Sequence, residues 1–190
     1  MNILEGLKLI KSLSWQEVFN FWRENEANEE HWKKHYQERG FSTWDEWRQT
    51  NVGPFKCAEK EWGLYEIEKP LEKIPTFFGG PFQGWMKNSY GGKNEKLFVE
   101  LVELPDIQSH AGVLSISNNF PIDKTITGMI IQENKIVIIE GMHRCCAIAL
   151  MARNKTPFSG TLKIALAKSD TELPRVGEGY SYPKRNSNQK

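Results

Sequence analysis

The residues best suited to chemistry form one short segment, Glu140, Gly141, Met142, His143 and Arg144. A glycine lets the backbone bend tightly and lets a ligand approach without meeting a β-carbon. An arginine guanidinium can hold two phosphate oxygens, and a histidine can donate a hydrogen bond or move a proton near neutral pH. A carboxylate can bind magnesium or accept a proton from a hydroxyl group. The segment therefore predicts a site for a nucleotide phosphate or a similar anion, with Glu140 as metal ligand or general base.

A buried strand and a helix are expected to position this segment. Residues 136–139 are consecutive β-branched residues, which is typical of a strand buried on both faces. The apolar residues that follow have the spacing of a helix, and they are Cys145, Cys146, Ala149 and Leu150. The first amides of a helix have no partner inside it, and the helix dipole favours an anion there. Backbone amides near Met142 and His143 would therefore bind phosphate.

A structural role for the same residues remains an alternative. Glu140 could cap the helix, and Arg144 could form an ordinary ion pair with it. Cys145 belongs to the same helical turn and is a candidate cofactor-binding residue through its position. Its side chain, however, is expected to face the core as a small apolar residue.

Residues 136–150, Ile-Val-Ile-Ile-Glu-Gly-Met-His-Arg-Cys-Cys-Ala-Ile-Ala-Leu, resemble the signature of the ParB/sulfiredoxin superfamily. That signature is an apolar strand, an acidic or small residue, Gly, any residue, His or Arg, Arg, two residues and Ala. The resemblance covers residues 126–167, extends back to residue 64, and is absent from the first fifty-odd residues. It implies a small mixed sheet with packed helices and a nucleotide whose phosphates lie at the start of the helix.

Departures from the superfamily narrow the implied activity. Sulfiredoxins have their catalytic cysteine where this chain has Met142, a thioether that cannot attack a phosphate. Partition proteins continue into a helix-turn-helix domain, whereas a short tail follows here, so DNA binding is not expected. The free serine kinases have Asp-Gly-His-His-Arg, the closest match. By resemblance, this implies phosphoryl transfer from an ATP, ADP or CTP-type nucleotide, with Mg²⁺, to a small hydroxylated substrate.

Two other functions remain open at this point. The first is a nucleotide-gated interaction module without catalysis, in which tryptophan-rich N-terminal helices contact a protein partner. The second is a thiol-dependent, sulfiredoxin-like protein that uses Cys145 or Cys146.

Three further residues are candidates for the same pocket. Glu68, at the end of an alternating strand at residues 64–68, could supply a second catalytic carboxylate. Lys87 and Asn88 lie in a segment rich in glycine and aromatic residues, residues 69–92, and could reach a phosphate or the substrate. Solvation of an exposed surface is the alternative explanation for each of them, and for Lys87 and Asn88 it is the favoured one.

His31 and His35 have the i, i+4 spacing that can chelate a metal on a helix. No glutamate follows His31, so the metalloprotease signature is incomplete. Metal binding at this pair is a minor alternative.

The remaining elements follow from capping and periodicity. Ser14 and Thr43 each begin a capping box, and a further helix is expected at residues 28–39. The first fifty residues are predicted to be helical, as are residues 94–104 and 105–118. Strands are predicted at residues 125–132, 135–139 and 162–167, the first two forming a hairpin at Glu133-Asn134.

The sequence predicts an α/β (α+β) fold in three parts. A helical N-terminal extension is expected at residues 1–56, a nucleotide-binding domain at 57–170 and a flexible tail at 171–190. Five of the seven tryptophans lie in the extension, where they either dock its helices onto the rest of the fold or form a base-stacking platform.

Composition excludes several classes of function. Lys and Arg number 25 against 24 Asp and Glu, so there is no basic field to hold nucleic acid or an anionic membrane. Three cysteines without C-x-x-C spacing argue against a disulfide framework or a zinc cage. With no signal peptide or membrane span in the pattern, a cytoplasmic protein is expected.

Overall fold

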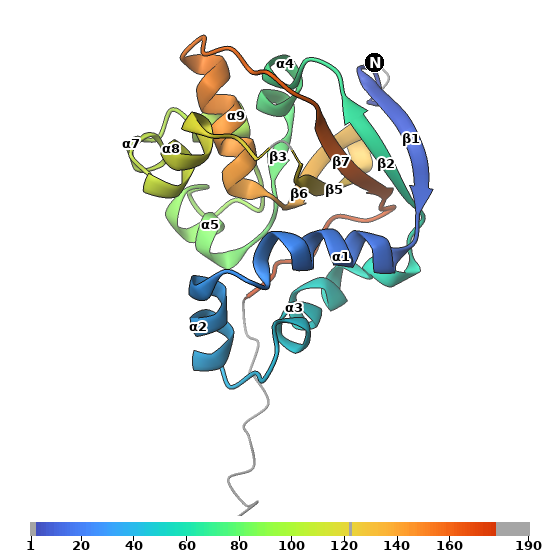
Figure 1. Ribbon diagram of the computed structural model, residues 1–190. Helices are drawn as coiled ribbons and strands as arrows, with labels where there is room; N and C mark the ends of the chain where they lie inside the picture. Colours follow the sequence, from blue (N-terminus) through green and yellow to red (C-terminus); the bar gives the residue numbers. More distant parts are fainter. Residues whose placement is uncertain (1–2, 122, 178–190) are drawn as a thin grey trace, which may run out of the picture.

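A seven-stranded mixed sheet runs through residues 3–121 and 123–177, the part of the chain that the computed structural model describes (Figure 1). Its strands are β1 (Leu7–Leu13), β2 (Trp62–Ile67), β3 (Phe78–Gly79), β4 (Lys96–Leu97), β5 (Thr125–Ile131), β6 (Lys135–Glu140) and β7 (Leu162–Lys168). Their order across the sheet is β1-β2-β7-β5-β6-β3-β4. The pairs β5–β7 and β3–β6 are parallel, and the others are antiparallel. The predicted α/β class is confirmed.

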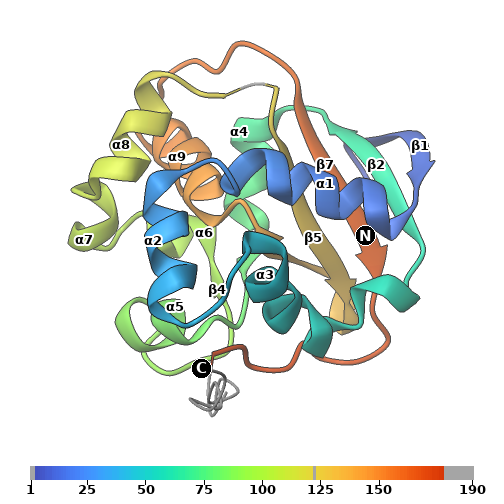
Figure 2. The same ribbon diagram turned by 60° about the horizontal axis from the view of Figure 1, so that its bottom comes forward.

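Helices cover both faces of this sheet. The α-helices are α1 (Trp15–Glu26), α2 (Glu30–Glu38), α3 (Trp44–Val52), α4 (Pro70–Lys73), α5 (Gln83–Asn88), α6 (Phe98–Leu101), α7 (Pro105–Gln108), α8 (Ala111–Asn118) and α9 (Met142–Arg153). Short 3-10 turns occur at Gly53–Phe55, Cys57–Glu59, Ile74–Thr76 and Gln132–Asn134. One face packs mainly on α9 and its neighbours, and α1 to α3 cover the other (Figures 1 and 2).

The β5–β6 hairpin lies at the centre of the fold. Every residue of β5 is buried, and β6 is buried from Ile136 to Glu140. Asn134 has a φ of 56°, the left-handed conformation that asparagine tolerates better than most residues, so the predicted hairpin is confirmed. The β-branched run forms an interior strand because both of its faces meet helices.

The tryptophan-rich helices pack on the sheet through their aromatic faces. Both predicted capping boxes are present, at Ser14 with Glu17 and at Thr43 with Glu46. The indole Nε1 of Trp22 donates a hydrogen bond of 2.8 Å to Oγ1 of Thr127 on β5. Figure 2 shows α1 lying across the sheet at this point. The docking interpretation is confirmed, because these rings are packed inward rather than displayed as a platform.

The first fifty residues are not all helical as predicted. Residues 7–13 form β1, which pairs with β2 at the margin of the sheet, with a register irregularity between Leu9 and Lys11. Most of β1 is exposed. Its sequence therefore lacks the alternation of apolar and polar residues by which a half-buried strand is recognised. The predicted N-terminal extension thus contributes a strand to the same sheet as residues 57–170.

The prediction of two long helices, at residues 94–104 and 105–118, is also wrong. Residues 96–97 pair with β3, and the rest divides into three short helices, with breaks before Pro105 and at His110, which caps α8. An apolar spacing close to 3.6 is equally compatible with several short helices that share one buried side.

The C-terminal segment is packed as far as it is described. Leu173 and Val176 are buried, and the amide of Val176 donates a hydrogen bond of 2.9 Å to the carbonyl of Pro81. The tail predicted from residue 171 is therefore wrong for residues 171–176. Residues 178–190 lie outside the described residues.

Replacing Thr127 with valine should destabilise the protein by about 1–3 kcal/mol, because it leaves the buried indole N–H of Trp22 without an acceptor. Thr125→Val, on the same strand and also buried, removes no side-chain hydrogen bond given for the described residues and should cost less. Urea unfolding of both variants measures the difference. Equal losses would show that α1 does not depend on this bond.

Candidate functional site

Gly141 forms the turn that joins β6 to α9. Its φ of 94° and ψ of 23° lie in the left-handed region, which other residues rarely adopt. A β-carbon at this position would lie 2.6 Å from Cγ2 of Ile126, on the neighbouring strand. The predicted strand, glycine turn and helix are confirmed, and both backbone conformation and space require glycine here.

The first turn of α9 presents free backbone amides. The amide of Cys145 donates to the carbonyl of Gly141 at 2.9 Å, which is the first hydrogen bond of the helix. Among the described residues, the amides of Met142, His143 and Arg144 have no acceptor, and no side chain caps this helix. These three amides, at the positive end of the helix dipole, can attract an anion. Cys145 can contribute neither its amide nor its buried thiol to a ligand.

Arg144 is turned inward rather than toward solvent. Its Nη2 forms an ion pair with Oε1 of Glu140, and its Nη1 donates a hydrogen bond of 3.3 Å to the carbonyl of Thr125. Arg144 is 7% exposed and Glu140 is 4% exposed. The guanidinium that was expected to hold phosphate oxygens is therefore occupied by internal partners in this structure. The i, i+4 spacing of the two residues makes the internal pair possible, as the structural alternative proposed.

Helix α1 contacts this ion pair through the side chain of Asn25. Asn25 Nδ2 donates hydrogen bonds to Oε2 of Glu140 at 3.2 Å and to the carbonyl of Thr125 at 3.1 Å. Both carboxylate oxygens of Glu140 are thus occupied. Burial raises the pKa of Glu140, while the charge of Arg144 opposes that rise.

The arrangement around Glu140 does not fit a magnesium site. No group of three His, Cys, Asp or Glu side chains in the described part of the chain is placed to hold a metal ion. Glu140 itself faces Arg144 and Asn25 rather than other oxygen ligands. Its assignment as a metal ligand finds no supporting geometry.

His143 is the predicted residue that remains exposed at the start of α9. Its ring stacks on the ring of His110, with centroids 4.7 Å apart, and lies 5.4 Å from the ring of Trp85. Although His143 as a residue is exposed, these neighbouring rings remove water from part of its imidazole, and this desolvation, helped by the charges of His110 and His31, lowers the pKa of His143 to about 4. At neutral pH the imidazole is therefore neutral, with one nitrogen able to donate and the other able to accept.

Sequence reasoning missed His110 and Trp85. His110 is the N-cap of α8, where its Nδ1 accepts a hydrogen bond of 3.3 Å from the amide of Val113. Trp85 is on α5, the helix that also carries the exposed residues Lys87 and Asn88. Lys87 and Asn88 therefore lie on an element that borders the site, and their assignment as phosphate-binding or substrate-binding residues stays a prediction. Nothing in the local sequence of His110 or Trp85 connects either residue to residue 143.

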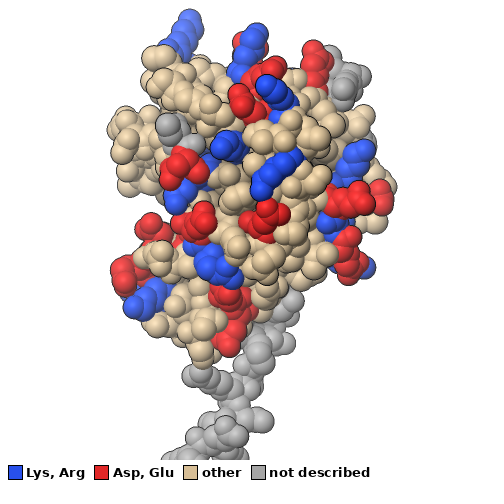
Figure 3. All heavy atoms as spheres, turned by 45° about the vertical axis from the view of Figure 1, so that its right-hand side comes forward, with Lys and Arg blue, Asp and Glu red and all other residues tan. Residues whose placement is uncertain are grey.

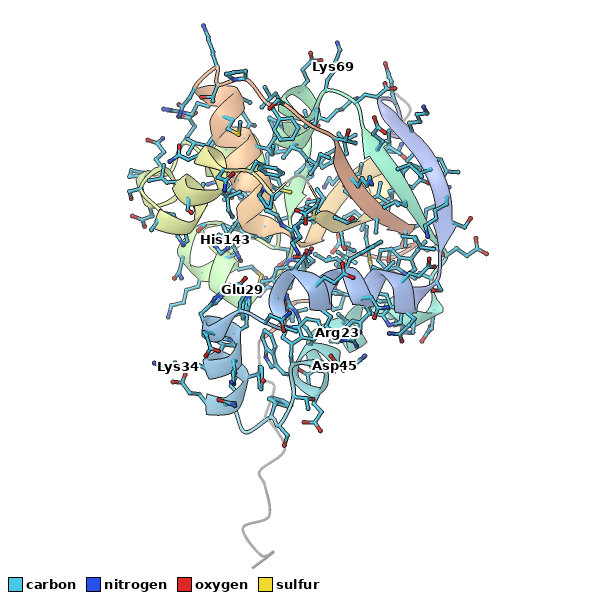
Figure 4. The ribbon with its side chains drawn as sticks, viewed as in Figure 1. Arg23, Glu29, Lys34, Asp45, Lys69 and His143 are labelled. Atoms are coloured by element: carbon cyan, nitrogen blue, oxygen red, sulfur yellow. The ribbon has the colours of Figure 1, made fainter. Side chains whose placement is uncertain are left out.

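Glu68 does not join this site. It is exposed just beyond β2, which is separated from β6 by β7 and β5, a distance across the sheet of about 14 Å. Its neighbour Lys69 lies far from His143 in Figure 4. Glu68 faces solvent beside β1, and its assignment as a second catalytic carboxylate finds no supporting contact in the structure.

The predicted metal pair His31 and His35 instead packs on tryptophans. The ring of His31 lies 4.8 Å from that of Trp32, and the ring of His35 lies 5.2 Å from that of Trp47. These contacts account for the i, i+4 spacing, because both histidines follow the same face of α2.

A thiol-dependent function lacks a reactive thiol among the described residues. Cys57, Cys145 and Cys146 are all buried and free. Burial raises the pKa of Cys57 and of Cys146 to about 12, and it also raises that of Cys145. The thiolate, which is the reactive form, is therefore strongly disfavoured at each cysteine.

The charges on the protein surface produce no long-range field that would attract an anion to the site. Figure 3 shows Lys and Arg interspersed with Asp and Glu over the face in view, in line with the formal charge of +1. Any attraction for an anion must come from local groups around the start of α9.

Comparisons with protein-family models, curated proteins and solved structures found no match to this chain. Of the helices in the described ranges, none has both the length and the apolar composition needed to cross a membrane.

Replacing Glu140 with glutamine should destabilise the protein by about 3 kcal/mol, because the buried charge of Arg144 loses its counterion. Glu103→Gln, which breaks the exposed pair with Arg153, is the matched control and should cost about 0–1 kcal/mol. Chemical denaturation at neutral pH gives both values. A Glu140→Gln variant as stable as the control would contradict the buried ion pair.

The stability of the protein should fall as the pH is lowered from about 6.5 to about 4, partly because of His143. In this range the unfolded chain protonates the imidazole, whereas the folded protein keeps it neutral, so protons favour unfolding. His143→Gln should reduce this slope, and an NMR titration of the ring should give a midpoint near 4. A midpoint near the ordinary value would show that the stacked rings do not shield it.

Proposed function

We propose that the protein binds a nucleotide through its phosphates at the first turn of α9. The observation that supports this proposal is the placement of three free amides, those of Met142, His143 and Arg144, beside the exposed ring of His143. Amides at a helix start bind phosphate oxygens, and the left-handed conformation of Gly141 makes the turn that places them. The resemblance of residues 136–150 to the ParB/sulfiredoxin signature supports the same ligand class.

The groups at this turn have different roles in the proposal. The amides and the imidazole N–H of His143 donate to phosphate oxygens. Lys87 and Asn88, exposed on the same helix as Trp85, are proposed to contact the ligand from one side. Arg144 and Glu140 neutralise each other and hold the turn in place. An incoming phosphate carries the same charge as Glu140 and can compete with it for the guanidinium.

Phosphoryl transfer to a small hydroxylated substrate is the finer part of the proposal. It is supported by the match of Glu140-Gly141-Met142-His143-Arg144 to the free serine kinase motif. If phosphate displaces Glu140 from Arg144, the carboxylate becomes available to accept the proton of a hydroxyl group. Its raised pKa makes the carboxylate a stronger base toward that hydroxyl group, and the proton that it accepts is released to solvent at the end of the cycle.

A nucleotide-gated interaction module without turnover is the second candidate. The observation that favours it is the contact of Asn25, on α1, with Glu140. A ligand that moves Glu140 would break its hydrogen bond with Asn25 on α1. The N-terminal helices would therefore respond to nucleotide. A protein partner that binds those helices could then distinguish the two states.

The decisive measurement is calorimetric titration with ATP, ADP, CTP and tripolyphosphate, with and without magnesium. Tripolyphosphate lacks a base, so its binding isolates recognition of phosphate. His143→Gln should weaken nucleotide binding about tenfold or more, because one hydrogen bond to a charged group is lost. His35→Gln, on α2 and packed against Trp47, is the control and should bind normally.

Product analysis by mass spectrometry with small hydroxylated acceptors separates the two candidates. A phosphorylated product supports transfer, and binding without product supports the interaction module. If neither nucleotides nor tripolyphosphate bind at millimolar concentrations, the proposed function is wrong.

A further inference from the structure

A cavity of about 330 Å³ lies at the opposite end of β6 from the candidate site. It is lined by residues of the β5–β6 hairpin, the segment before β4 and the C-terminal segment, including Lys135 at the first position of β6. The candidate site follows Glu140, the last residue of that strand, so the two regions are about 17 Å apart along the chain. The cavity is therefore independent of the proposed nucleotide site.

The floor of this cavity is apolar and its walls are fixed. Ile131, Val137 and Leu173 are buried residues of the core that reach its lining. Arg175 Nε donates to Oδ1 of Asn94 at 2.7 Å, and Gln132 Nε2 donates to the carbonyl of Asp170, also at 2.7 Å. These bonds tie the C-terminal segment to the other two walls. The cavity is thus formed before a ligand arrives, as is usual for small-molecule sites.

Four charged side chains line the cavity, and two of them are already matched. Lys135 Nζ lies 2.8 Å from Oε1 of Glu95, and both side chains are partly buried. Lys93 and Glu172 are exposed and have no ion partner among the described residues. The lining therefore offers a ligand one ammonium group, one carboxylate and a small apolar surface.

From this arrangement we infer that the cavity binds a free α-amino acid with an aliphatic side chain. The ligand carboxylate pairs with Lys93, its ammonium group pairs with Glu172, and its side chain covers Ile131, Val137 and Leu173. A ligand with a single charge would leave one of the two groups unmatched at the cavity mouth. The volume, at the lower end of the usual range for ligand pockets, suits a small molecule of this kind.

Methyl NMR of the full chain with L-leucine as the probe tests this inference. Titration should shift the methyl signals of Ile131, Val137 and Leu173. Two probes of the same shape separate the charges, since 4-methylpentanoate lacks the ammonium group and 3-methylbutylamine lacks the carboxylate. Each should bind about tenfold more weakly than leucine, because one charge-assisted hydrogen bond is lost.

Variants identify the two charged groups. Lys93→Met should weaken the binding of leucine more than the binding of 3-methylbutylamine, which has no carboxylate to lose a partner. Glu172→Gln should weaken the binding of leucine more than the binding of 4-methylpentanoate, which has no ammonium group. Lys8→Met and Glu59→Gln, also at exposed positions, are the matched controls and should leave leucine binding unchanged. The inference is overturned if leucine shifts none of these methyl signals, if the three probes bind equally, or if the Lys93 and Glu172 variants behave as the controls do. Nucleotide binding is measured on the same variants, so failure here is distinct from failure of the α9 site.

Discussion

The buried ion pair between Glu140 and Arg144 is the interaction on which the arrangement of the central elements depends. It joins the end of β6 to the first turn of α9, and Asn25 and the carbonyl of Thr125 complete its hydrogen bonds. Removing either charge would leave the other buried without a partner, which costs far more than an exposed pair. The pair therefore fixes the direction in which α9 leaves the sheet. It thereby also fixes the positions of the three free amides and of the His143 ring.

A second buried ion pair, between Glu26 and Arg48, supports the first from the N-terminal helices. Arg48 lies over the rings of Trp22 and Trp47, and Trp44 donates a hydrogen bond of 3.2 Å to Glu26. Because α1 carries both Asn25 and Glu26, polar contacts connect α3 through α1 to the start of α9. The N-terminal region is thus part of the candidate site's support.

The central elements were predictable from the sequence because their signals are local. The run at residues 136–139, the glycine at 141 and the capping residues Ser14 and Thr43 each specify a backbone state without distant contacts. The ion pair of Arg144 with Glu140 was foreseen as the structural alternative, but its closure by Asn25 was not predictable, since Asn25 lies more than a hundred residues away in the chain. The stacking of His143 on His110 is likewise a product of tertiary packing.

The margins of the sheet have a consequence for association between molecules. β1 carries Lys8 and Lys11 and an irregular register between Leu9 and Lys11, while β4 at the other margin has only two residues. Lysines, bulges and very short strands are features that discourage a further strand from adding to a sheet. Leu9 and Ile10 are exposed on β1, yet the backbone there is a poor template for pairing. The sheet is built to end within one molecule, which protects the protein against polymerisation through its edges.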